Sequence, residues 1–403
     1  MNKPPSPMRV LLISHTCQSR REGQPKAAQL SRLPGVELRV LVPDRWHEYG
    51  NWRRAQPPLE GGYEYQVGAV RWPWSGPAQW YLHWYPDLAR TLREFQPDIV
   101  DLWEEPWGLV SAHAAWLCRR LLPQAKIIAE TEQNIAKTLP PPFETFRSYT
   151  LRRADFVIGR SREAVENTRA KGYAGPAAVV PNAVDADLFR PLDRAECRRA
   201  LGLSGFVAGY IGRIVEEKGL AEMVDALALC PPDVTLLFLG SGAYQPVLEQ
   251  RVREAGLADR IRFLAARPLE ELPQVMNALD TLVLPSRTTP RWKEQFGRVI
   301  IEAHACETPV VGSDSGAIPD VIGKAGLVFP EGDPQALAAA LSALRADPRL
   351  AREMGRIGRR QVEECYTWTR VAERMRDIYR GVLDAGSAER SRQDGLGWSS
   401  GSS

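Results

Sequence analysis

Short apolar segments recur along the whole chain and are separated by longer stretches in which apolar and polar residues mix with helical spacing. The segments that we expect to form strands cover residues 10–14, 36–42, 67–70, 99–103, 126–130, 156–159 and 177–180 in the first half, and 206–211, 234–239, 261–264, 281–284, 309–312 and 326–329 in the second. Runs this short and continuous are typical of parallel strands that helices cover on both faces. Their alternation with helical stretches predicts an α/β fold with two doubly wound, Rossmann-like sheets.

With 403 residues, the chain is longer than a typical domain built around one hydrophobic core, which favours two domains. We expect a first Rossmann-like domain over residues 1–188 and a second over residues 189–366. A helix over residues 367–386 follows the second domain. The Gly/Ser-rich segment 387–403 carries few apolar residues, so we expect it to be disordered.

Composition narrows the class of protein. The net charge of only +3 argues against a dedicated nucleic-acid binder. The six cysteines are scattered without a C-x-x-C pair and the five histidines are dispersed, which predicts a reducing compartment and no metal site or disulfide framework. The start of the chain lacks the features of a signal peptide, and no run approaches the ~20 apolar residues of a membrane helix. We therefore expect a cytoplasmic protein. Peripheral contact with the cytoplasmic membrane face stays open, because segment 116–122 is basic and amphipathic.

Two carboxylates, Glu294 and Glu302, lie eight positions apart on either side of a Phe-Gly pair that opens a predicted helix. A glycine turn that leads into a helix exposes free backbone N–H groups at the positive end of the helix dipole. Such a turn suits a phosphate or a sugar hydroxyl, so the two acids can bind different parts of one ligand. Taken alone, the pair could equally be a surface loop acid and an ordinary helical Glu.

Other candidate residues also follow predicted strands. Gly212 and Arg213 follow the strand at 206–211, and Gly240 follows the strand at 234–239. Ligands of open α/β sheets bind at the carboxyl ends of the strands, which predicts a single site for these loops. Arg213 and Lys218 together can neutralise a diphosphate. Two solvated loop cations remain the alternative.

The segment 294–302 resembles the E-x7-E signature of the retaining glycosyltransferases of family 4 (glycosyl transferases group 1), which have the two-domain GT-B fold. Three further segments resemble motifs of that family in the order it requires: 154–161, 180–191 and 209–219. The similarity is strong from about residue 150 to 330 and weak before it. The resemblance implies two Rossmann-like domains that face a cleft, the first binding an acceptor and the second a nucleotide sugar. It also implies that the helix at 367–386 crosses back to the first domain.

The resemblance also implies a donor site for a nucleoside-diphosphate sugar, used as a co-substrate without a cofactor or metal. Arg213 and Lys218 would contact the donor diphosphate, Glu302 the ribose hydroxyls, and Glu294 the transferred sugar. Glu294, Arg213 and Lys218 would thus be the catalytic residues. The further donor-binding residues that it implies are Phe296, Gly297, Arg298, Val299, Gly212, Gly240 and Arg267.

The acceptor side departs from the family pattern. Many relatives carry a histidine after a strand of the first domain, but the corresponding segment 128–134 has none. Glu130, Glu132, Gln133 and Asn134 then become candidates for orienting the acceptor or the transferred sugar, and one of the two acids is expected to be structural. In the loop after the first strand the candidates are Gly23 and Lys26, where a solvated basic loop is the alternative.

Together with the resemblance, these residues predict a retaining glycosyltransferase that moves a sugar to a saccharide, lipid-linked or other glycoconjugate acceptor. Its place in polysaccharide or glycolipid biosynthesis is what the resemblance alone implies. One alternative is a nucleotide-sugar epimerase or hydrolase on the same fold, which the missing histidine favours slightly. The other is a non-catalytic protein that binds sugar nucleotides. Arg213, Lys218, Glu294 and Glu302 are all present, which argues against the non-catalytic alternative.

Overall fold

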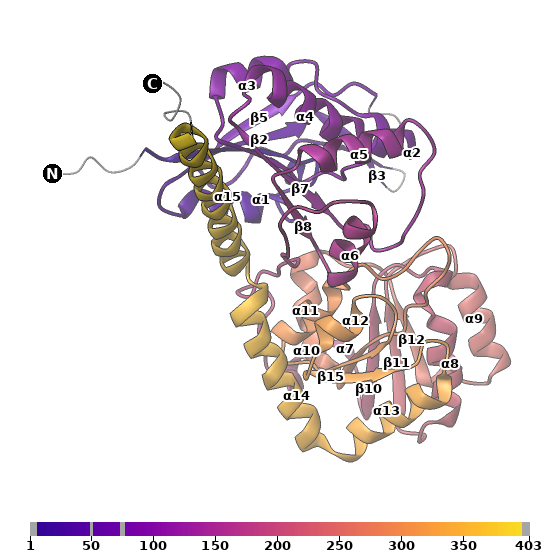
Figure 1. Ribbon diagram of the computed structural model, residues 1–403. Coiled ribbons are helices and arrows are strands. Elements are labelled where there is room, and N and C mark those ends of the chain that lie inside the picture. Colours follow the sequence, from indigo (N-terminus) through magenta and orange to yellow (C-terminus); the bar gives the residue numbers. More distant parts are fainter. Residues whose placement is uncertain (1–5, 49–50, 73–76, 397–403) are drawn as a thin grey trace, which may run out of the picture. The chain divides into compact units, whose positions relative to one another are not determined.

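The computed structural model describes residues 6–48, 51–72 and 77–396 (Figure 1). Contacts divide the chain into two compact units. The first unit runs to Val180 and resumes at Trp368, and the second spans Pro181–Thr367. The division therefore lies before the boundary expected at residue 188. The reason is that Val184 and Phe189 are buried in the hydrophobic core of the second unit.

The first unit is built on a parallel sheet with the strand order β5-β2-β1-β6-β7-β8-β9. Its strands are β1 (Met8–Ile13), β2 (Val36–Pro43), β5 (Glu64–Gly68), β6 (Ile99–Leu102), β7 (Lys126–Thr131), β8 (Phe156–Gly159) and β9 (Ala177–Val179). The central strands are buried almost throughout, because helices cover both faces of the sheet. Six of the seven apolar runs of the first half are thus confirmed as strands, and the run expected at 67–70 overlaps β5 only at residues 67–68.

Helices of this unit are α1 (Gln24–Arg32), α2 (Pro77–Leu82), α3 (Leu88–Phe95), α4 (Leu109–Leu121), α5 (Phe143–Arg153), α6 (Arg162–Ala170) and α15 (Trp368–Leu396). Leu11 and Ile13 of β1 pack in one cluster with Leu92 of α3 and Val110 of α4. Helix α1 contacts both β2 and α15. Helix α15 extends beyond the helix expected at 367–386, and residues 397–403 lie outside the described part of the chain.

An antiparallel hairpin of β3 (Arg45–Glu48) and β4 (Asn51–Arg54) follows β2. Trp46 is buried at 1% exposure, whereas Trp52 is exposed. The sequence did not predict this hairpin, since Arg-Trp-His-Glu and Asn-Trp-Arg-Arg carry too few apolar residues to show a strand pattern.

The second unit contains a parallel sheet with the order β12-β11-β10-β13-β14-β15. Its strands are β10 (Phe206–Ile211), β11 (Val234–Leu239), β12 (Ile261–Leu264), β13 (Thr281–Leu284), β14 (Val310–Ser313) and β15 (Gly326–Phe329). Its helices are α7 (Arg194–Leu201), α8 (Leu220–Leu229), α9 (Gln245–Glu254), α10 (Leu272–Ala278), α11 (Arg298–Ala305), α12 (Ile318–Ile322), α13 (Pro334–Ala346) and α14 (Pro348–Gln361). The predicted α/β fold with two doubly wound parallel sheets is confirmed.

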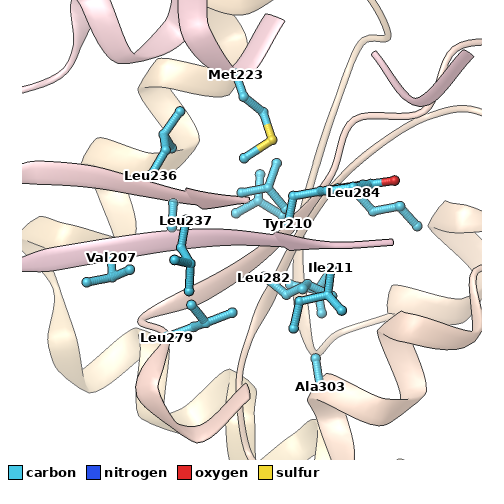
Figure 2. Packing of buried hydrophobic residues seen from close by; sticks show 14 of the residues in the cluster. Val207, Tyr210, Ile211, Met223, Leu236, Leu237, Leu279, Leu282, Leu284 and Ala303 are labelled. Carbon is cyan, nitrogen blue, oxygen red and sulfur yellow. The ribbon is translucent and has the colours of Figure 1, made fainter. Parts of the chain in front are cut away.

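One continuous apolar core holds the second unit together. In Figure 2, Met223 of α8 approaches the strands from one face, and Leu279 and Ala303 approach from the opposite face. Leu236 and Leu237, adjacent on β11, are both buried because the sheet has no solvent-facing side at its centre.

Each sheet has one point at which the strand order reverses: between β1 and β6 in the first unit, and between β10 and β13 in the second. Loops at the carboxyl ends of such strand pairs diverge and leave room for a ligand. Loops at these points carry His15 and Glu104 in the first unit, and Arg213 and Ser286 in the second. Within the described ranges, no helix combines the length and apolar character needed to cross a bilayer.

Candidate functional site

Lys218 and Glu294 form an ion pair in the second unit, with 2.5 Å between Nζ and Oε2. Lys218 ends a short 3-10 turn (Glu216–Lys218) after β10, and Glu294 lies in the loop after β13. The Ser286 hydroxyl donates a second hydrogen bond to Glu294 Oε2 at 3.0 Å. The side chains of Lys218 and Glu294 are only 14% and 11% exposed. The structure therefore brings together two of the three residues that the sequence predicts to be catalytic.

Arg213, the third, lies in the loop that begins directly after β10. The Tyr210 hydroxyl, near the end of that strand, donates a hydrogen bond of 2.6 Å to the Arg213 carbonyl oxygen. Gly240 faces the same loop, with φ at +148°. A Cβ at Gly240 would lie 1.8 Å from the Gly212 carbonyl oxygen, so the two predicted glycines pass each other in direct backbone contact. This packing fixes the path of the chain just before Arg213.

The predicted glycine turn at the start of α11 is present. Gly297 caps the helix with φ at +79°, and a Cβ there would lie 2.9 Å from Ile300 Cδ1. Phe296 is buried, with its ring 5.9 Å from that of Tyr366. Because the first N–H groups of a helix lack intrahelical acceptors, the turn offers donors beside Glu294. The Phe296 side chain anchors the turn in the core and leaves any ligand contact to the backbone.

Glu302 lies on α11 between Ile301 and Ala303, which are both fully buried. Burial raises the pKa of Glu302, and the nearby Arg298 guanidinium partly opposes this effect. Val299 packs against the apolar core of the second unit, whereas Arg298 is exposed. Arg267 follows β12 and forms an ion pair of 3.5 Å with Glu271.

Lys26 of the first unit lies on α1, and it is buried at 1% exposure rather than solvated in a loop. Its Nζ lies 2.5 Å from Glu130 Oε1 and 3.9 Å from Asp101 Oδ2. Arg160 forms an ion pair with the other oxygen of Glu130 and is equally buried. The Trp103 ring lies 4.2 Å from Lys26 Nζ. The solvated-loop alternative for Lys26 is thus wrong, because Glu130 draws the ammonium into the core.

The two carboxyl groups of this buried cluster differ in pKa. Burial tends to raise the pKa of Glu130, but the cations of Arg160 and Lys26 lower it to about 2. Burial and the neighbouring Glu130 charge raise the pKa of Asp101 to about 8. The pKa of Glu130 is therefore held below the usual range of a carboxyl group, and that of Asp101 above it. Of the two acids considered for the acceptor side, Glu130 is the internal one.

Glu132 is the exposed member of the pair, at 41%, with Arg160 Nε 3.6 Å from its carboxylate. Its backbone N–H donates to Glu105 Oε1 at 2.8 Å. The Gln133 N–H donates to the Thr131 hydroxyl at 3.2 Å, and Asn134 Nδ2 donates to Glu163 at 3.3 Å. The three predicted residues thus form one ordered loop after β7.

Glu104 and Glu105, which follow β6, were missed by the sequence reasoning. Glu104 accepts hydrogen bonds from the His15 backbone N–H at 2.6 Å and pairs with His15 Nδ1 at 2.8 Å. His15 also stacks on Trp46, with 4.5 Å between ring centroids. The available signal was their position, since both acids directly follow a predicted strand. Gly23, the remaining candidate of the first unit, caps the start of α1.

Among the described residues, no group of three or more His, Cys, Asp or Glu side chains is arranged to hold a metal ion.

Two family models match the chain. Residues 27–188 match the model described as Glycosyltransferase Family 4, and residues 194–361 match the model described as Glycosyl transferases group 1. A D-inositol 3-phosphate glycosyltransferase of Corynebacterium jeikeium is 30% identical over 306 residues, which cover 71% of this chain and 69% of the relative. A GDP-mannose-dependent phosphatidylinositol monomannoside mannosyltransferase of Mycolicibacterium smegmatis is 33% identical over 248 residues, or 58% of this chain and 64% of that protein. The chain spans only about half to two thirds of the length of several curated relatives that it matches.

Solved structures agree on the fold. Sucrose-phosphate synthase from Thermosynechococcus elongatus superposes with a TM-score of 0.70 at 23% identity, covering 94% of this chain and 100% of the other. The Anabaena protein HepE, in complex with UDP and glucose, gives a TM-score of 0.68 at 20% identity, with coverage of 93% and 100%.

Proposed function

Because the chain belongs to glycosyltransferase family 4, we propose that it is a retaining glycosyltransferase that moves a sugar from a nucleoside-diphosphate sugar to a saccharide, lipid-linked or other glycoconjugate acceptor. The observation that carries this proposal is the pairing of Lys218 with Glu294 at the switch point of the second sheet. A cation suited to a diphosphate and an acid suited to a sugar hydroxyl stand in direct contact there.

We assign the following roles to these residues, in keeping with the family resemblance. Arg213 and Lys218 neutralise the charge that develops on the departing diphosphate. Glu294 and the N–H groups at the start of α11 orient the transferred sugar, and Glu302 binds the ribose. The bond from the anomeric carbon to the diphosphate breaks as the bond to the acceptor oxygen forms on the same face of the sugar. The leaving phosphate takes the acceptor proton, so the chemistry needs no protein base.

The names of relatives guide the choice of substrates. One relative uses GDP-mannose, and several act on D-inositol 3-phosphate. We propose that the acceptor of this chain belongs to the same broad group of phosphorylated polyols, sugars and glycolipids, and that its product enters polysaccharide or glycolipid biosynthesis.

A thermal-shift panel of UDP, GDP, ADP and TDP, with their sugars, tests the donor site. A ligand that binds only the folded state raises the melting temperature. We expect one nucleotide to give a clear shift that Arg213→Ala removes. The absence of a shift with every nucleotide would favour a protein without donor binding.

Transfer itself is tested with Glu294→Gln. The variant keeps the shape of the side chain but removes the charge that the sugar needs, so transfer should fall by about 100-fold or more. Lys218 keeps its charge and loses a competing partner, so affinity for the nucleoside diphosphate should hold or rise. Unchanged transfer would refute the role of Glu294. Release of free sugar or of an epimer without any need for an acceptor would favour an epimerase or hydrolase.

A further inference from the structure

The basic segment 287–293, which precedes Glu294, is an arm with mostly exposed side chains that hydrogen bonds tie to the rest of the second unit. The Arg287 N–H donates to the Glu217 carbonyl oxygen at 2.9 Å, next to Lys218 in the chain. The Arg287 guanidinium forms an ion pair with Glu222, a buried residue at the start of α8. The arm is therefore tied to the loop that carries the diphosphate lysine.

A tight turn fixes the end of this arm. The Trp292 N–H donates to Thr289 Oγ1 at 2.9 Å, and the Thr289 N–H donates to the Trp292 carbonyl oxygen at 2.8 Å. The turn holds the half-buried indole over Lys218, with 4.6 Å between Nζ and the ring centroid. This separation lies well within the ~6 Å at which a cation is attracted to the face of an aromatic ring.

We propose that Trp292 is a positioning residue that holds the Lys218 ammonium ready for the diphosphate of the donor. The inference rests on the proposed donor site and deepens it. Lys218 has Glu294 as its anionic contact and the indole as its aromatic contact. When a diphosphate replaces Glu294 as the anion, the indole still orients the ammonium, and less side-chain freedom is lost on binding.

The experiment compares wild type, Trp292→Leu and Trp292→Phe. The affinities of UDP, GDP, ADP and TDP are measured by calorimetry, and those of the matching nucleosides by ligand-observed NMR. For the diphosphate that binds wild type best, Trp292→Leu should weaken binding by about fivefold to thirtyfold, the range expected for a partly desolvated cation–π contact. Trp292→Phe keeps an aromatic face and should stay within about threefold of wild type. Nucleoside affinity should not change in either variant.

Trp116 supplies a matched control. It lies on α4 of the first unit, is exposed, and has the Arg120 guanidinium 4.8 Å from its ring. Trp116→Leu removes a similar cation–π pair without touching the donor site, so it should leave diphosphate affinity unchanged.

Fluorescence gives a second readout that needs no stable Leu variant. Binding of the diphosphate changes the surroundings of the Trp292 indole, so part of the emission change seen in wild type should be absent in Trp292→Phe. Equal emission changes in both proteins, or equal diphosphate affinity in wild type and Trp292→Leu, would overturn the inference. An equal loss of nucleoside affinity would show a general structural role and would overturn it too. If wild type binds no nucleoside diphosphate, the proposed function itself fails. If Arg213→Ala removes diphosphate binding but Trp292→Leu leaves it unchanged, only the role of Trp292 fails.

Discussion

Tyr379 of α15 donates a hydrogen bond of 2.6 Å to Asp101 Oδ2 on β6. Both side chains are fully buried, and Asp101 also lies 3.9 Å from Lys26 Nζ. Helix α15 comes from the far end of the chain, yet it belongs to the first unit and packs on α1. The bond therefore connects the last helix to the charged cluster beneath the predicted acceptor loop.

Tyr379→Phe should lower the free energy of unfolding by about 1–3 kcal/mol, because it leaves a buried Asp101 oxygen without its donor. Urea unfolding followed by circular dichroism measures the loss. In the double variant Tyr379→Phe/Asp101→Leu both partners are apolar, so the total loss should be smaller than the sum of the single losses. Additive losses would show that the two side chains do not interact.

Gly240→Ala should disrupt the donor site through the backbone. The new Cβ would lie 1.8 Å from the Gly212 carbonyl oxygen, and φ of +148° disfavours any L side chain. We expect a loss of more than ~2 kcal/mol in stability and a fall of at least tenfold in affinity for the nucleoside diphosphate.

Gly256→Ala is the control for this change. Gly256 also has a positive φ, +66°, but a Cβ there would meet nothing within 4 Å. It should cost only about 1–2 kcal/mol for the left-handed backbone and leave nucleotide affinity unchanged. Similar nucleotide affinities in the two variants would contradict the importance of the contact between Gly240 and Gly212.

Acid should destabilise the second unit through His304. This histidine is fully buried on α11, and burial lowers its pKa from 6.5 to about 4. Below pH 6.5 the unfolded chain binds a proton that the folded state does not, so stability falls as the pH drops from about 6.5 to 4. The loss amounts to about 3 kcal/mol at pH 4, at 1.36 kcal/mol for each pKa unit. Unfolding free energies of wild type and His304→Leu, measured from pH 7 to 4, should differ in slope over this range. Parallel curves would contradict the prediction.

The sequence predicted the two sheets well because their strands are buried on both faces and appear as continuous apolar runs. It also predicted that Lys218 and Glu294 share a site, although 76 positions separate them, since both follow strands of one parallel sheet. The β3–β4 hairpin lacks such a run, so it could not be seen. Tertiary packing decides which side of a short polar strand becomes buried. Local composition does not show that packing, so such a strand is missed.

Lys26 shows the same limit at the level of a single residue. Its neighbours Arg20 and Arg21 make the segment look like a solvated basic loop. Its burial depends on Glu130, 104 positions away, and on Arg160, which balances the second oxygen of that acid. Such a partner choice is a property of the folded sheet, in which β7, which carries Glu130, lies beside β8, which ends just before Arg160.

Glu105, in the loop after β6, holds the predicted acceptor loop in place. Its Oε2 accepts from the Thr131 hydroxyl at 2.7 Å, and its Oε1 accepts from the Glu132 N–H at 2.8 Å. Burial raises the pKa of Glu105 to about 7. Glu105→Ala leaves both donors without this acceptor, so the loop that carries Glu132 should lose its fixed position.

We expect Glu105→Ala to raise the KM for the acceptor by about tenfold and to leave donor affinity unchanged, because the donor residues lie in the second unit. Glu105→Gln keeps both contacts, since its amide oxygen can accept from the Glu132 N–H while its NH2 group donates to the Thr131 hydroxyl. That variant should retain activity and lose the part of the pH dependence near pH 7 that comes from ionisation of Glu105. Steady-state kinetics with each substrate varied in turn, from pH 6 to 8, measures both effects. Equal losses for donor and acceptor in Glu105→Ala would mean that Glu105 supports the fold as a whole and not the acceptor loop.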